Sequence, residues 1–162
     1  MMRTKTTALL LATMAIFLCA VGIAAAEEVT QEAYVAKVEP ICEKNSKENE
    51  KILGNVKTDV KKGKLKLAAT ALAKAATALG KTYGELKVVP EPTASEATLS
   101  KWLGYVQKEQ TLLASTGKAL KANKKSKASH EETELDHYAN LANSTVFSFH
   151  FHYCRSDLSK FI

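Results

Sequence analysis

Residues that commonly carry chemistry are scarce in this chain of 162 residues. Its three methionines all lie within the first 14 residues, and Arg155 is the only arginine beyond residue 26. The sequence has no haem-attachment motif, glycine-rich phosphate loop or Gly-x-Ser-x-Gly elbow. These absences exclude methionine ligation of haem or copper beyond residue 26 and disfavour phosphate recognition by arginine forks. We therefore expect a binding or structural protein without a cofactor, rather than an enzyme.

The first 26 residues have the composition of a secretory signal peptide. Arg3 and Lys5 precede an apolar run from Ala8 to Ala26 that closes on Ala24-Ala25-Ala26. We expect cleavage after Ala26 and a single domain over residues 27–162, secreted or held in the cell envelope. An uncleaved anchor is the alternative, because the apolar run is almost long enough to span a bilayer.

The charge balance is only mildly basic. The formal net charge is +6 for the whole chain, and residues 27–162 carry 21 Lys or Arg against 17 Asp or Glu, which leaves +4. A charge this small does not predict a specific nucleic-acid partner.

Three cysteines are present, and Cys19 lies within the expected signal peptide. Exported proteins meet oxidising conditions, and two remaining cysteines allow one connectivity. The sequence therefore predicts a disulfide between Cys42 and Cys154.

Apolar residues recur at helical spacing in four segments. The first runs from about Thr30 to Lys62, with a kink or restart expected at Pro40 and a left-handed end at Gly63. The second and third carry an apolar residue every seven positions: Leu65, Leu72, Leu79 and Leu86, then Leu99, Val106, Leu113 and Leu120. The fourth begins between Lys125 and Ser129, after a left-handed end at Asn123.

Four helices with short turns predict an all-α fold, an up-down-up-down four-helix bundle. In that topology the start of the first helix and the end of the fourth lie at one end of the bundle. Cys42 and Cys154 fall near those two places. The helical pattern and the cysteines thus predict the same architecture, a bundle closed by one disulfide.

Residues 147–153 do not fit the helical pattern cleanly. Phe147, Phe149, Phe151 and Tyr153 alternate with polar residues, which is a strand signal. A lone strand without a partner is poorly stabilised, so we favour a helix through most of this stretch and keep the extended conformation as the alternative.

Ten lysines surround the first and third turns, which the topology places at one end of the bundle. They are Lys57, Lys61, Lys62, Lys64, Lys66, Lys118, Lys121, Lys124, Lys125 and Lys127. We call this set the Lys-rich pole. The simpler interpretation, which we favour from the sequence alone, is a solvated end whose lysines stabilise helix C-termini. The functional hypothesis is that the pole docks an anionic polymer or lipid surface of the cell envelope.

A metal site is a weaker alternative function. His130, Glu134 and His137 lie at i, i+4 and i+7 on one helix face, and Glu134-x-x-His137 is half of a carboxylate-bridged di-metal pattern. The second Glu-x-x-His motif of that pattern is missing from the sequence. Acidic residues near a helix start also have a simpler interpretation, since they complement the helix dipole.

Four asparagines lie on or near the predicted helix seams: Asn45 and Asn49 in the first helix, Asn140 and Asn143 in the fourth. A small buried polar cluster of this kind fixes the register between helices. The other interpretation is that these asparagines line a cleft.

Two stretches around the cysteines carry a resemblance to known proteins. They are Tyr34-Val-Ala-Lys-Val-Glu-Pro-Ile-Cys42 followed by Asn45, and Ala139-Asn-Leu-Ala-Asn143 with Tyr153-Cys154. The chain resembles a group of uncharacterised exported small helical proteins of actinobacteria. The resemblance implies a secreted bacterial protein of helical fold. The group has no established activity, so it assigns no functional residues.

Overall fold

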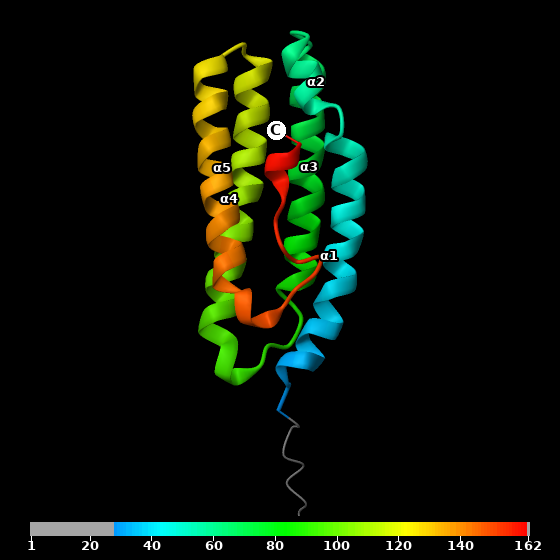
Figure 1. Cartoon of the computed structure of the whole chain (residues 1–162), viewed down its shortest axis with the longest axis vertical. Helices are drawn as coiled ribbons and strands as arrows, with labels where there is room; N and C mark the ends of the chain where they lie inside the picture. The colour runs from blue at the N-terminus through cyan, green and yellow to red at the C-terminus, as the bar shows by residue number, and fades with distance from the viewer. Residues whose placement is uncertain (1–27, 162) are drawn as a thin grey trace, which may run out of the picture.

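A computed structural model describes residues 28–161, and the predicted signal peptide lies outside that range. The long helices are α1 (Gln31–Leu53), α3 (Leu65–Leu86), α4 (Glu96–Lys121) and α5 (Lys125–Thr145), with a short α2 (Val56–Lys61) after α1. Single 3-10 turns span Thr93–Ser95, Phe147–Phe149 and Leu158–Lys160, and residues 28–161 contain no strand. The long helices alternate in direction (Figure 1), which confirms the all-α four-helix bundle.

The four long helices pack in chain order. The main contacts join α1 to α3, α3 to α4, and α4 to α5. The chain after α5 turns back and runs along the bundle between the α1 side and the α4–α5 side (Figure 1). We call residues 146–161 the returning segment.

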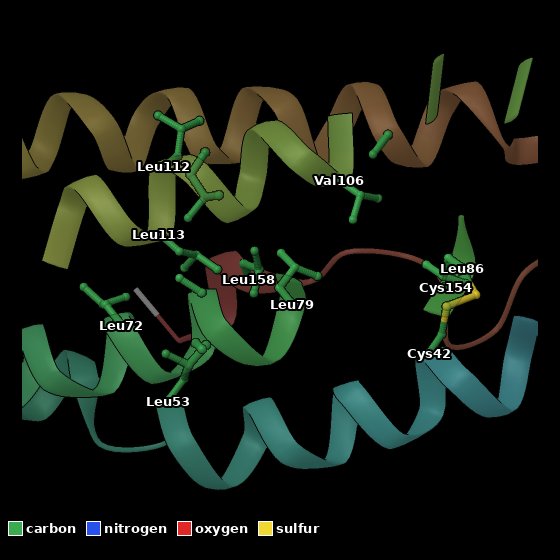
Figure 2. Packing of buried hydrophobic residues seen from close by; sticks show 14 of the residues in the cluster. Cys42, Leu53, Leu72, Leu79, Leu86, Val106, Leu112, Leu113, Cys154 and Leu158 are labelled. Atoms are coloured by element: carbon green, nitrogen blue, oxygen red, sulfur yellow. A yellow bond between two sulfur atoms is a disulfide. The ribbon is translucent and has the colours of Figure 1, made fainter. Parts of the chain in front are cut away.

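The predicted apolar stripes form the core. Leu72, Leu99 and Leu113 are fully buried, and Leu79, Leu86, Val106 and Leu120 are at most 8% exposed. Leu158 of the returning segment belongs to the same apolar cluster (Figure 2). Of the two stripes, only Leu65 is half-buried.

Small residues allow α3 and α4 to pack closely. Buried alanines occupy much of the α3 face, and Gly117 of α4 lies against it. A Cβ at Gly117 would lie 3.1 Å from the Ala69 carbonyl oxygen and 3.3 Å from Leu72 Cβ. Close packing of this kind leaves little room for neighbours to shift when a core side chain is removed.

The two turns of the Lys-rich pole have the same geometry. Gly63 and Asn123 take left-handed conformations, with φ of 70° and 56°. In each turn the next backbone N–H donates to a carbonyl five residues back, Lys64 to Asp59 at 2.7 Å and Lys124 to Ala119 at 2.9 Å. Both are Schellman-type ends, and their left-handed residues are the two that the sequence predicted.

The first helix is interrupted at a different place from the one expected. α1 continues through Pro40 without a restart, and the break falls at Gly54 and Asn55, after which α2 begins. Proline removes one helical hydrogen bond. Buried Val38 and Cys42 on either side of it anchor the helix to the core and offset that loss.

The expected helix through residues 147–153 is also wrong. α5 ends at Thr145, one 3-10 turn follows, and His150 takes a left-handed conformation with φ of 53°. Phe149 and Phe151 are both buried, with ring centroids 5.3 Å apart. Residues two apart point to different sides of a helix, so burying both rings requires a non-helical backbone.

The reversal after α5 brings Cys154 to Cys42. The two cysteines form a disulfide with a Cα–Cα distance of 4.9 Å (Figure 2), which confirms the predicted bond. Cys42 lies near the midpoint of α1, so the bond sits along the length of the bundle and not at its end. Cys154 accordingly belongs to the returning segment and not to the fourth helix.

Polar contacts hold the returning segment on both sides. Glu39 of α1 accepts hydrogen bonds from the backbone N–H groups of His152 and Tyr153, at 2.8 and 2.9 Å. Asn143 of α5 accepts from the Ser156 N–H and donates to the Ser156 carbonyl, both at 2.8 Å. The segment therefore bridges the two outer helices of the bundle.

Candidate functional site

The Lys-rich pole forms as the sequence predicted. The α2–α3 and α4–α5 turns lie at the same end of the bundle, away from the start of α1 (Figure 1). All ten of its lysines are exposed. Residues from two turns that are far apart in the chain thus form one basic end.

The charge of the protein is unevenly distributed. Residues 57–66 and 118–127 contain the ten lysines and one acid, Asp59, a formal charge of +9. The rest of residues 27–162 contains eleven basic and sixteen acidic side chains, a formal charge of −5. The modest net charge therefore conceals a strongly basic end on an acidic body, an arrangement that orients a protein toward an anionic partner.

Two helix N-termini and two helix C-termini meet at this end. α3 and α5 begin here with Lys64 and Lys124 at their N-cap positions, and neither cap makes a side-chain hydrogen bond. Neither of these fully described helices has an acid in its first turn. The negative C-terminal ends of α2 and α4 lie at the same two turns, so the helix dipoles oppose one another there and the lysines supply the charge of this end. Lys127 makes an ion pair with Glu131 at 3.7 Å.

A groove between α3 and α4 leads away from the pole. Its volume is about 580 Å³, and Lys66, Lys118 and Lys121 line it. Alanines of α3 and Gly117 of α4 form much of its surface. Three of the pole's lysines therefore border a groove with small side chains.

The weaker metal hypothesis gains nothing from the structure. His130 and His137 are exposed and Glu134 is half-buried on α5. Within residues 28–161 no group of three or more His, Cys, Asp or Glu side chains is arranged to hold a metal ion.

The sequence reasoning missed Glu109. This residue lies on the inner face of α4 and is only 2% exposed. The Ser156 hydroxyl of the returning segment donates to Glu109 Oε2 at 2.6 Å. Burial raises the pKa of the Glu109 carboxyl to about 7, although the hydrogen bond from Ser156 acts in the opposite direction.

Glu109 borders a cavity of about 80 Å³ beside the disulfide, and the cavity opens to the surface at the returning segment. α1 contributes Asn45 and Asn49, and apolar side chains of α3 and α4 supply the walls. Glu109 Oε1 and the Oδ1 atoms of both asparagines are buried without a hydrogen-bond partner among the described residues. The three residues border the cavity, but these three oxygen atoms are themselves enclosed by neighbouring atoms.

The four asparagines predicted at helix seams do not form one cluster. Asn45 and Asn49 line the cavity, in agreement with the second interpretation of the pattern. Asn143 holds Ser156, and Asn140 is exposed.

One feature of the sequence does indicate Glu109. Trp102, Glu109 and Thr116 recur every seven residues, three positions after Leu99, Val106 and Leu113. All three are buried, because this register faces the core. A carboxyl group at a core position of a heptad pattern is a candidate site residue.

We predict that Glu109 makes the protein more stable at acidic than at basic pH. A folded-state pKa near 7, above the ordinary 4.5, means that the folded protein binds the proton more tightly than the unfolded chain. This contribution to stability is complete below pH 4.5 and is lost as the pH rises through 7. Between pH 5 and pH 8 the loss amounts to about 2–3 kcal/mol, measured as the free energy of unfolding in urea.

Glu109→Gln should remove this pH dependence, because glutamine resembles the protonated acid. The exposed Glu48→Gln variant of α1 is the control and should keep it. Equal pH dependence in the two variants would contradict the assignment to Glu109.

No known protein-family model, curated protein or solved structure matches the chain. The resemblance to exported actinobacterial proteins accordingly stays a prediction. Among the helices within residues 28–161, none is long and apolar enough to cross a membrane.

Proposed function

We propose that this protein is a binding module of the cell envelope that docks anionic polymers or anionic lipid surfaces through its Lys-rich pole. One observation carries the proposal: ten exposed lysines from two distant turns lie at one end of a body that is otherwise net acidic. The uneven charge orients the molecule with this end toward an anionic partner.

The chemistry of lysine suits a repetitive partner. Each ammonium is a compact point charge on a flexible stem and does not require the fixed geometry of an arginine fork. A single exposed ion pair contributes little. Near an anionic surface, however, each lysine adds about 1 kcal/mol, and the attraction is screened beyond about 8 Å at physiological salt.

Export of the protein is part of the same proposal. Two observations support it: the signal-like composition of residues 1–26 and the Cys42–Cys154 disulfide. Disulfides persist in oxidising compartments outside the cytosol.

A solvated end is the competing interpretation, and it makes a different prediction. Lys61 lies in the last turn of α2, and Lys118 and Lys121 lie in the last turn of α4, where cations stabilise the helix dipole. If this were the only role of the lysines, their neutralisation would lower stability and leave binding to anions unchanged.

We expect the variant Lys61→Gln, Lys62→Gln, Lys124→Gln, Lys125→Gln to lose binding to vesicles that contain anionic phospholipid. At about 1 kcal/mol per lysine, the loss in affinity reaches about a thousandfold at low salt. Co-sedimentation with the vesicles measures it. Binding of the parent protein should fall as salt is raised, and the melting temperature of the variant should change little.

The control carries the same change in charge at the other end of the bundle: Lys37→Gln, Lys81→Gln, Lys87→Gln, Lys101→Gln. All four of these lysines are exposed. The control should bind nearly as well as the parent. Equal loss in both variants would show that net charge alone governs binding, and no binding by the parent at low salt would contradict the proposal.

A soluble polyphosphate in place of the vesicles separates the two classes of partner. Leu67 is 57% exposed beside the lysines of α3. If a lipid surface is the partner, Leu67→Ser weakens vesicle binding but not binding of the polyphosphate, because only a membrane offers an apolar phase to this side chain.

The cavity beside Glu109 supports a second candidate function, the binding of a small ligand within the bundle. It uses a different part of the molecule, so either function can be tested without the other.

A further inference from the structure

We propose that the groove between α3 and α4 holds a single-chain anionic lipid, with its headgroup at the Lys-rich pole and its alkyl chain along the small side chains of the two helices. The inference deepens the proposed function and rests on it, because the groove shares Lys66, Lys118 and Lys121 with the pole. It names one class of partner, a lipid molecule, in place of a soluble polymer.

The groove follows the line along which α3 and α4 pack. The two helices run in opposite directions (Figure 1). Gly117 of α4 lies against Ala69 of α3, where a Cβ atom would come within 3.1 Å of the Ala69 carbonyl oxygen. The lining residues fall within residues 66–77 of α3 and residues 110–121 of α4. At about 1.5 Å per residue, either run spans about 16 Å, which is long enough for a medium-length alkyl chain.

One end of the groove is basic. Lys66 belongs to the first turn of α3, and Lys118 and Lys121 belong to the last turn of α4, so the antiparallel packing places all three at the pole. None of the three makes an ion pair within residues 28–161, and no acid lines the groove. An anionic headgroup therefore meets positive charge that is not already neutralised, and a phosphate group is a common partner of lysine.

Beyond the lysines the groove offers few hydrogen-bonding groups. The Thr70 and Thr77 hydroxyls both donate to carbonyl groups of their own helix, at 2.9 and 3.0 Å. Gln110 lies over Gly80, where a Cβ atom would come within 2.5 Å of Gln110 Nε2. The rest of the lining is formed by four alanines and one glycine: Ala69, Ala73, Ala76, Ala114 and Gly117. An alkyl chain suits this surface, whereas a sugar or a peptide would find few partners for its polar groups.

The size of the groove is also suitable. Its volume of about 580 Å³ is typical of small-molecule sites. Each methylene group that leaves water strengthens binding by up to about fourfold. Chain length and headgroup charge should therefore contribute separately to the affinity, and each can be varied in the ligand without the other.

Titration with dodecyl phosphate, kept below the concentration at which it forms micelles, tests the proposal by NMR. The backbone amide signals of residues 69–77 and 110–118 should shift together and saturate, with a dissociation constant below about 1 mM. Octyl phosphate should bind at least about tenfold more weakly, because it has fewer methylene groups to bury. Inorganic phosphate lacks the chain, and dodecyltrimethylammonium carries the same chain with the opposite charge. Neither should give this saturable response.

Two variants connect the response to the groove. Ala73→Phe fills the groove and should weaken the binding of dodecyl phosphate at least about tenfold. Ala73 is exposed, so the larger side chain should change the melting temperature little. Ala36→Phe, the same change at an exposed position of α1, is the control and should bind as the parent does. The variant Lys66→Gln, Lys118→Gln, Lys121→Gln removes the charge at the headgroup end and should also weaken binding at least about tenfold.

Soluble polyphosphate, added to the same protein, distinguishes a failure of this inference from a failure of the proposed function. If the parent binds polyphosphate at the pole but dodecyl phosphate gives no saturable shift in the groove, the inference is overturned and docking through the pole stands. The same holds if Ala73→Phe binds dodecyl phosphate as tightly as the parent. If the parent binds neither, both are overturned. A dimer in solution that Ala73→Phe dissociates would show that a second copy occupies the groove, which also overturns the inference.

Discussion

Replacing both Cys42 and Cys154 with alanine should lower the free energy of unfolding by about 4–5 kcal/mol, because the disulfide closes a loop of 112 residues and restricts the unfolded chain. For a domain of this size, such a loss lowers the melting temperature by roughly 15–20 °C. Urea and thermal denaturation of the double variant measure both quantities. The effect is a large part of the total stability of a single domain, which is about 5–15 kcal/mol.

Reduction of the parent protein provides the control, since it breaks the same bond without a change of sequence. It should reproduce most of the loss seen in the double variant. Mass spectrometry of the exported protein should find Cys42 joined to Cys154 within one chain. Free thiols in the folded exported protein, or a loss below about 1 kcal/mol, far under the typical range, would contradict the prediction.

Leu72→Ala should cost about 2–5 kcal/mol, the range for truncation of a buried leucine. Leu72 is fully buried on α3, and the position of Gly117 shows that α4 packs directly against it. Closely packed backbones cannot collapse into the space left by the side chain, so we expect a value toward the upper end. Urea denaturation at constant pH measures the change.

Leu67→Ala is the matched control on the same helix. Leu67 is 57% exposed, so its truncation should change stability by no more than about 0.5 kcal/mol. Alanine is as good a helix former as leucine, and the difference between the two variants therefore reports packing alone. Equal effects at the two positions would mean that the seven-residue stripe does not form the core.

The helices and their turns could be predicted because they follow from local features. The spacing of Leu72, Leu79 and Leu86 identifies one buried face. Gly63 and Asn123 mark two left-handed helix ends, since glycine and asparagine adopt that conformation most readily. The position of the Lys-rich pole follows from these turns and from the antiparallel topology.

The returning segment could not be predicted, because its conformation is determined by contacts distant in the chain. The alternating aromatic residues form neither a strand nor an α-helix here. Phe149 and Phe151 are buried against the body of the bundle, and Glu39 accepts a hydrogen bond from a backbone N–H group 113 residues away. The cysteines indicated that the two parts meet, but not that the chain reverses to bring them together.

Only some of the residues that line the cavity could be predicted from the sequence. Asn45 and Asn49 were recognised as polar residues at a helix seam, and they do line it. The hydrogen bond that Glu109 accepts comes from Ser156, a residue 47 positions away in the returning segment. The sequence did not predict that this segment would lie against α4. The place of Glu109 in the heptad pattern of α4 was the available signal.

NMR mapping of the isotope-labelled protein with soluble polyphosphate at low salt tests the proposed function most directly. If the Lys-rich pole is the docking surface, the backbone amide signals of residues 57–66 and 118–127 shift together and saturate, and those near the α3–α4 connection at residues 87–95 stay in place. Shifts centred on residues 87–95, or spread evenly over the surface, would contradict docking through this end of the bundle.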